Sequence, residues 1–232
     1  MDYKEKLISL MDCISAQEKK FISDLKGQKP SFKRSYDNWG FMDVLSHCSC
    51  WRILAAEKLE KIAAGSVVDF HENLDSINRK FHDSTFTLPL EQIETLTEKS
   101  SLLLKDRLMR LDNVLLASKS RLKGFNNDLW CYVLVDGFVH PTVHMVFHYI
   151  KLQSFDTAFN LLQGNYLLLL EQSREPGIIA EYFSMGEIFE ELDEMEDKEA
   201  ILANLKTFIE KSTHQGTLTL SVTENFLKYN KL

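Results

Sequence analysis

Apolar residues recur at every third or fourth position along most of the chain, which is the spacing of amphipathic helices. In the first such segment Leu7, Met11, Ile14 and Phe21 form one stripe, and Gly27 marks its end. No segment shows the strict alternation of a half-buried strand. The pattern predicts helices over residues 2–26, 39–64, 74–82, 89 to about 112, 129–152, 155–171, 178–194, 198–211 and about 221–229.

Few residues interrupt these helices, because the 232-residue chain has only 9 glycines and 4 prolines. The strongest break is the pair Pro176-Gly177. We therefore predict an all-α protein with two domains. Residues 1–175 would form an antiparallel helix bundle, and residues 176–232 a C-terminal helical appendage packed on it.

The composition is ordinary for a globular protein, with 44% hydrophobic and 26% charged residues. A net charge of −7 argues against a nucleic-acid-binding protein, which needs a clustered basic surface. The apolar runs are far shorter than a membrane span. The four cysteines lack paired spacing, which predicts reduced thiols, and the charged N-terminal segment is unlike a signal peptide. We expect a soluble, cytoplasmic protein, and a homo-oligomer is compatible with the sequence.

Candidate chemistry gathers between His140 and His148, where three histidines follow one another at intervals of four residues. Residues four apart lie on one face of a helix, so two of these imidazoles can bind one divalent metal ion. A third ligand has to come from elsewhere, and His47 is the best candidate. We predict His47, His140 and His144 as ligands. Two alternatives stay open: His144 pairs with His148, or the histidines are hydrogen-bonded core residues.

Pro141 complicates the helix that carries these histidines. The residue before a proline is pushed away from helical geometry. The helix therefore either begins at Pro141, with His140 as its cap, or bends at this point.

Other side chains near the histidines have weaker claims to a functional role. We expect Trp39, Trp51 and His148 to line a pocket beside the metal ligands, although a core position also suits both tryptophans. Cys48 and Cys50 are expected to be small buried residues rather than nucleophiles. A reactive thiol needs a nearby cation or metal to lower its pKa, and the sequence around them supplies none.

Two segments resemble the DinB/YfiT-like superfamily of helical bundles. The first runs from Trp39 to Trp51 and contains Asp43-Val-Leu-Ser-His47, with three residues between each tryptophan and this core. The second is His140-Pro-Thr-Val-His144, which is similar to the superfamily's second histidine motif. The sequence departs from the pattern at Gly40, where relatives usually have a capping serine or threonine.

Within that superfamily, the chain most resembles the ClbS/DfsB-like branch, which is linked to colibactin self-resistance. This similarity comes from residues 57–65 (Glu-Lys-Leu-Glu-Lys-Ile-Ala-Ala-Gly) and from Asp75-Ser-Ile-Asn78. The resemblance covers residues 5–172. It implies an up-down four-helix bundle, with a C-terminal helical extension, that holds a divalent metal, often nickel or zinc, with three histidines. Activities implied by the superfamily are thiol-dependent transfer, isomerisation and hydrolysis.

These observations lead to two functional hypotheses. The first is a metal-dependent enzyme, using zinc or nickel, that hydrolyses a small electrophilic molecule or conjugates it to a thiol in detoxification or self-resistance. The alternative is a metal-free helical protein that sequesters a small molecule or engages a partner protein. A third hypothesis lies between these two: a metal-free self-resistance protein that binds or opens a reactive metabolite.

Overall fold

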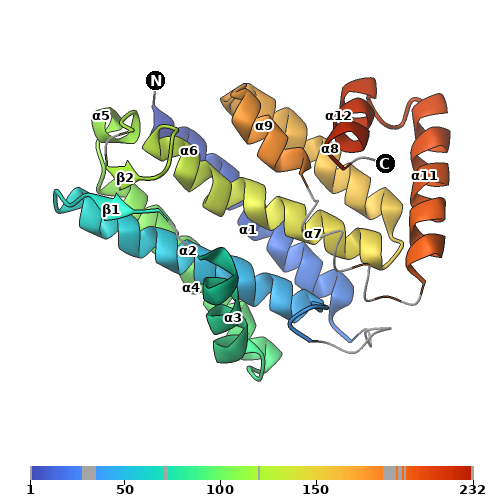
Figure 1. Ribbon diagram of the computed structural model, residues 1–232, viewed down its shortest axis with the longest axis horizontal. Helices are drawn as coiled ribbons and strands as arrows, with labels where there is room; N and C mark the ends of the chain where they lie inside the picture. The colour runs from blue at the N-terminus through green and yellow to red at the C-terminus, as the bar shows by residue number, and fades with distance from the viewer. Residues whose placement is uncertain are drawn as a thin grey trace. The chain divides into compact units, whose positions relative to one another are not determined.

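The computed structural model describes residues 2–27, 35–70, 73–119, 121–184, 192, 195 and 197–230. Most of the described residues are helical, which confirms the predicted all-α helical fold (Figure 1). The helices are α1 (Tyr3–Leu25), α2 (Phe41–Ala63), α3 (Leu74–Thr85), α4 (Leu90–Met109), α5 (Asn113–Leu116), α6 (Leu129–Leu134), the π-helical η1 (Val135–Val139), α7 (His140–Lys151), α8 (Phe155–Gln172), α9 (Pro176–Phe183), α11 (Lys198–His214) and α12 (Leu220–Asn230). Within the described ranges, no helix combines the length and apolarity needed to cross a membrane.

The helix ends follow local sequence signals. The Asp2 carboxylate accepts a hydrogen bond from the backbone N–H of Lys4 at 3.1 Å and caps α1. Gly27 lies just past the C-terminal end of α1 and has a φ of 87°, a value that residues with a Cβ atom rarely adopt. Pro89 precedes the first turn of α4, where its missing N–H costs nothing. Of the helix predicted over residues 178–194, α9 accounts for the part up to Phe183, and most of the remainder lies outside the described residues.

The chain divides into two compact units, and the first comprises residues 1–26 and 42–141. Inside this unit, α1 packs against α4, α6 and η1. The helices α1 and η1 approach closely at Gly137, where a Cβ atom would lie 3.0 Å from the Met11 sulfur and the Met11 side chain would have to shift slightly. The surrounding core is apolar, with Ile14, Leu104 and Phe138 almost completely buried.

The first unit also contains two short strands, although the sequence pattern predicted none. β1 (Val68–Asp69) pairs in parallel with β2 (Leu122–Lys123). Each strand has two residues, which is too short to produce an alternation of apolar and polar residues in the sequence. The pair joins the chain that follows α2 to the chain that precedes α6.

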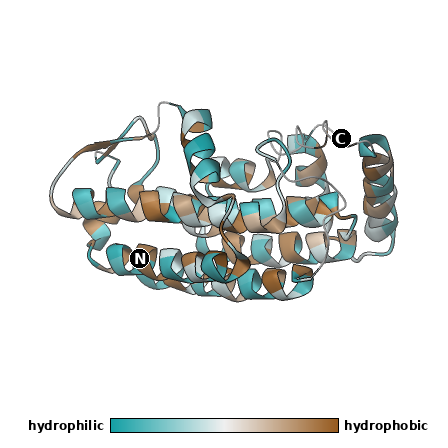
Figure 2. Ribbon diagram, turned by 90° about the horizontal axis from the view of Figure 1, so that it is seen from below, coloured by the Kyte–Doolittle hydropathy of each residue, from teal (hydrophilic) through white to brown (hydrophobic). Residues whose placement is uncertain are grey.

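The second unit comprises residues 27–41 and 142–232. In it, α12 packs against α9 and α11. Aromatic side chains fill its core, and the buried Tyr182 hydroxyl donates to the Leu162 carbonyl at 2.6 Å. The division from the first unit falls inside α7, between Pro141 and Thr142, whereas the boundary expected at residue 175 coincides with the start of α9. Figure 2 shows how hydrophobic and hydrophilic residues alternate around these helices, as amphipathic packing requires.

Candidate metal centre

The helix that carries two of the candidate ligands runs through Pro141 without a break. In an α-helix the proline ring would collide with the carbonyl group four residues earlier, and the proline supplies no N–H. Here the five-residue η1 directly precedes α7, and the His140 N–H donates to the Val135 carbonyl, five residues back. This wider turn accommodates the proline. The helix therefore neither begins at Pro141 nor breaks there, so His140 and His144 lie one turn apart on continuous helix.

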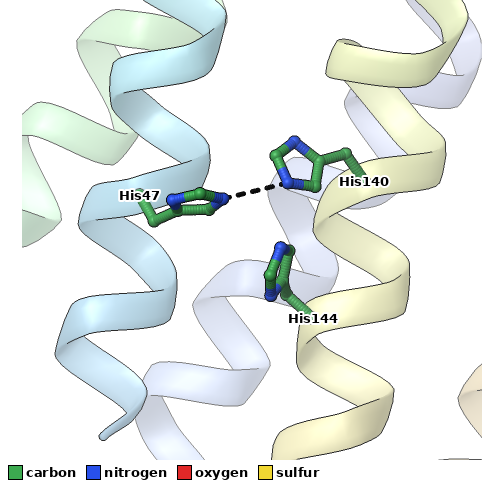
Figure 3. A group of neighbouring side chains, drawn as sticks. All are labelled: His47, His140 and His144. Carbon is green, nitrogen blue, oxygen red and sulfur yellow. Dashed lines mark hydrogen bonds between the residues drawn. The ribbon is translucent and has the colours of Figure 1, made fainter. Parts of the chain in front are cut away.

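Three histidines come together in the structure (Figure 3). His47 on α2 and His140 on α7 approach through their Nε2 atoms, which are 3.0 Å apart. One ring nitrogen from each of His47, His140 and His144 lies within 4.8 Å of the other two. These are the three residues that the sequence analysis predicted as ligands, and the structure brings them together. A search of the described residues for clustered histidine, cysteine and acidic side chains that could hold an ion finds this group. His148 does not belong to it.

The imidazoles are largely shielded from water. His47 and His144 are 6% and 8% exposed, and the His140 side chain is 22% exposed. Burial, helped by the positive charge of Arg52, lowers the pKa of His140 to about 4. His140 is therefore neutral at physiological pH, the state in which an imidazole binds a metal or accepts a hydrogen bond.

Arg52 is one turn beyond Cys48 on α2 and is 1% exposed. Its guanidinium group donates to both carboxylate oxygens of Glu18 on α1, at 3.2 and 2.5 Å. This fork-to-fork pairing gives the buried charge a full partner. The ion pair fixes α2 against α1 and places a permanent positive charge near His140.

The two tryptophans expected beside the ligands contact their rings. The Trp51 ring centroid lies 6.2 Å from that of His47 and 6.1 Å from that of His140. Its indole N–H donates to Asn78 on α3 at 3.0 Å, which fixes the ring orientation. Trp39 stacks on His144 at 5.5 Å.

Trp39 is held in place by a buried lysine two turns beyond His144 on α7. The Lys151 ammonium donates to the Trp39 carbonyl at 3.1 Å and to the Asn38 side chain at 2.8 Å. His148 is 4% exposed, and burial, followed by the charge of Lys151, lowers its pKa to about 3. His148 is thus a neutral buried residue next to the cluster rather than one of its members.

An acidic residue that sequence reasoning missed lies beside His140. Asp136 on η1 is 5% exposed, and its Oδ1 atom is 4.0 Å from His140 Nδ1. A single aspartate within an apolar helix attracts little attention in a sequence. The available signal was its spacing, because Tyr132, Asp136 and His140 follow one another at intervals of four residues.

The cysteines near His47 have no activated thiol. Cys48 is 2% exposed and Cys50 is half-buried. Burial raises the pKa of Cys48 far above its ordinary value and that of Cys50 to about 11. Both are thiols at neutral pH, so neither is a ready nucleophile.

No family model matches the chain, and no curated protein or solved structure matches it. The resemblance to the DinB/YfiT-like superfamily therefore stays a prediction. What the residues can do is inferred from the geometry of the three histidines and their neighbours.

Proposed function

We propose that the protein is a metal-dependent enzyme of the DinB-like type, in which His47, His140 and His144 hold one zinc or nickel ion. Its reaction would be hydrolysis of a small electrophilic molecule or transfer of a thiol to it, in detoxification or self-resistance in the cytoplasm. The observation that carries this proposal is that ring nitrogens of three histidines, from α2 and α7, lie within 4.8 Å of one another.

The donor set suits such an ion. Two ligands about 2.0–2.1 Å from a tetrahedral zinc lie about 3.3 Å from each other. The 3.0 Å between the Nε2 atoms of His47 and His140 is close to this separation. Three imidazoles leave a fourth position for water or substrate, as in catalytic rather than structural zinc sites.

The surrounding residues favour metal binding over protonation. A bound ion would polarise the substrate or lower the pKa of a coordinated water or thiol. Because His140 is neutral at physiological pH, it needs no deprotonation to act as a ligand. Trp51 and Trp39 hold the imidazoles in place, so little ordering has to accompany binding.

Elemental analysis of the purified protein, reconstituted with zinc or nickel, tests the site. We expect about one equivalent of metal in the wild type, from one three-histidine site, and none in His144→Ala. The matched control is His214→Ala, an exposed histidine at the end of α11, which should retain the metal. A wild type that takes up neither metal contradicts the proposal.

Catalysis requires a separate experiment. The reconstituted protein would be incubated with a panel of epoxides, activated esters and alkyl halides, with and without a low-molecular-weight thiol. We expect product formation that a chelator abolishes and that His144→Ala lacks. Full metal occupancy without turnover on any electrophile would leave a metal-binding protein and contradict the enzyme assignment.

A second candidate function has its own supporting observation. The direct Nε2–Nε2 contact at 3.0 Å is also a hydrogen bond, so His47 and His140 can satisfy each other without a metal. The protein would then bind a small molecule or a partner. Its thermal stability would be indifferent to chelators, and His47→Ala would destabilise the fold without affecting an activity.

A further inference from the structure

We propose that Asp136 is a positioning residue that holds His140 in its Nδ1–H tautomer and thereby fixes the proton arrangement of the whole His47–His140 pair. The consequence for metal binding rests on the proposed function. The assignment of the tautomer does not rest on the proposed function, because the tautomer is a property of the metal-free protein.

The argument begins with the two nitrogens of His140, which face different partners. Nε2 is 3.0 Å from His47 Nε2, and Nδ1 is 4.0 Å from Asp136 Oδ1. A separation of 4.0 Å is longer than a direct hydrogen bond, so the carboxylate acts on His140 Nδ1 through its charge, which favours an N–H on the nearer ring nitrogen. A neutral imidazole carries a single N–H, so placing it on Nδ1 leaves a lone pair on Nε2.

The electrostatic setting makes Asp136 an acceptor. Two cationic side chains, Arg52 and Lys58, interact with its charge. The Tyr132 phenol is kept protonated, because burial, and then the charge of Asp136, raise its pKa. An ionised carboxylate has no proton to donate, so beside these cations it can only accept the His140 N–H.

The helix geometry explains how Asp136 comes to lie beneath His140. In an α-helix, four residues overshoot a full turn by about 40°, so a stripe of residues four apart drifts around the axis. The π-helical η1 holds more residues per turn, which offsets that drift between residues 136 and 140. Thus the turn that accommodates Pro141 also aligns the carboxylate with the His140 ring.

The tautomer of one ring dictates that of the other. If His140 Nε2 carries the lone pair, His47 must donate its own Nε2–H across the 3.0 Å contact. Asp136 therefore leaves a lone pair on His140 Nε2 for a metal, whereas His47 would have to move its N–H from Nε2 to Nδ1 before its Nε2 could bind the ion. A carboxylate behind a ligating histidine is a common way to orient the ring and increase its basicity.

Histidine side-chain ¹⁵N NMR of the metal-free protein at pH 7 tests the tautomer directly, with His140 assigned by comparison with His140→Ala. We expect a protonated Nδ1 and a bare Nε2 on His140, and a protonated Nε2 on His47. Asp136→Leu removes the acceptor and should shift His140 towards the Nε2–H form. A wild-type His140 protonated at Nε2 overturns the proposal, even if the variant fails to fold, and so does an unchanged tautomer in Asp136→Leu.

The second readout is metal affinity, measured by competition with a chromogenic chelator. Asp136→Leu should weaken binding about 10–100-fold, whereas His140→Ala should abolish it. Asp156→Leu, an exposed aspartate on α8, is the matched control and should bind as the wild type does. Equal affinity in Asp136→Leu and wild type would overturn the positioning role alone. Absence of metal from the wild type would overturn the proposed function, and the NMR result would still decide the tautomer.

Discussion

The region around the three histidines and the C-terminal helices are both well packed, but they bury different chemistry. Next to His140 lie Asp136 and the Arg52–Glu18 pair, all 5% exposed or less. In the second unit, by contrast, α8, α9 and α12 meet through aromatic rings. Tyr166 and Phe183 are 4.9 Å apart and Phe159 and Phe226 are 5.0 Å apart, measured between ring centroids.

The difference supports the proposal that the histidine region, rather than the aromatic region, is the functional site. Burying an aromatic ring is favourable in itself. Burying a charged or neutral polar side chain is unfavourable unless every partner is in place, and an apolar replacement of the same shape is often at least as stable. The buried Asp136 carboxylate and the Arg52–Glu18 ion pair around His47 and His140 therefore favour a functional site over a purely structural one.

The largest effect is expected from breaking the ion pair in the histidine region. Arg52→Met leaves the Glu18 carboxylate buried without a partner and should lower the free energy of unfolding by about 3–5 kcal/mol. The double variant Arg52→Met/Glu18→Leu removes both charges and should recover most of that loss. Urea denaturation measures both. If Arg52→Met were as stable as the wild type, Arg52 and Glu18 would not form a buried ion pair in solution.

A comparable loss should follow in the aromatic region, but without a functional consequence. Phe226 is fully buried on α12, and Phe226→Ala should lower the free energy of unfolding by about 3 kcal/mol or more. Metal affinity of the folded variant should match that of the wild type. A large fall in affinity would mean that the two regions are not separable in the way their chemistry indicates.

A smaller effect is expected from pH, through His148. Its folded-state pKa is lowered to about 3, so below the ordinary value near 6.5 the unfolded chain binds a proton that the folded chain does not. Stability therefore falls as the pH decreases from about 6.5 towards 3, by up to about 1.4 kcal/mol per pH unit for this one group. In chelator-treated samples between pH 7 and 5, His148→Leu should show a shallower slope. Parallel curves would contradict a neutral, buried His148.

The smallest effect is expected at Cys50. Because burial raises the pKa of its thiol to about 11, the group contributes no thiolate at neutral pH. Cys50→Ser should leave metal content and any electrophile-directed activity within experimental error of the wild type. Loss of either in a folded variant would make the thiol a participant.

Much of the fold followed from sequence because amphipathic spacing is a local property. α1, α2 and α4 begin and end within a few residues of their predicted limits, since caps, glycines and Pro89 mark the ends. The histidine group was also accessible, because spacing of four residues places His140 and His144 on one face of a helix. His47 was added as a hypothesis, and the structure brings it to the other two.

What sequence reasoning missed depends on backbone detail and on distant partners. Pro141 indicated a disturbance, but only the structure shows that η1 absorbs it as a π-helical turn. Spacing of four residues places Asp136 on the same side of the helix as His140, but the position of its carboxylate also depends on that π-helical turn, which an α-helical wheel does not represent. The pairing of Arg52 with Glu18 spans 34 residues of sequence and leaves no local pattern.

X-ray absorption at the zinc edge of the reconstituted protein tests the central claim most directly. Three imidazole nitrogens and one water at about 2.0–2.1 Å are the expected first shell, with scattering typical of histidine rings and no sulfur. A zinc–sulfur distance near about 2.3 Å, or a site with fewer than three imidazoles, would contradict a centre built from His47, His140 and His144.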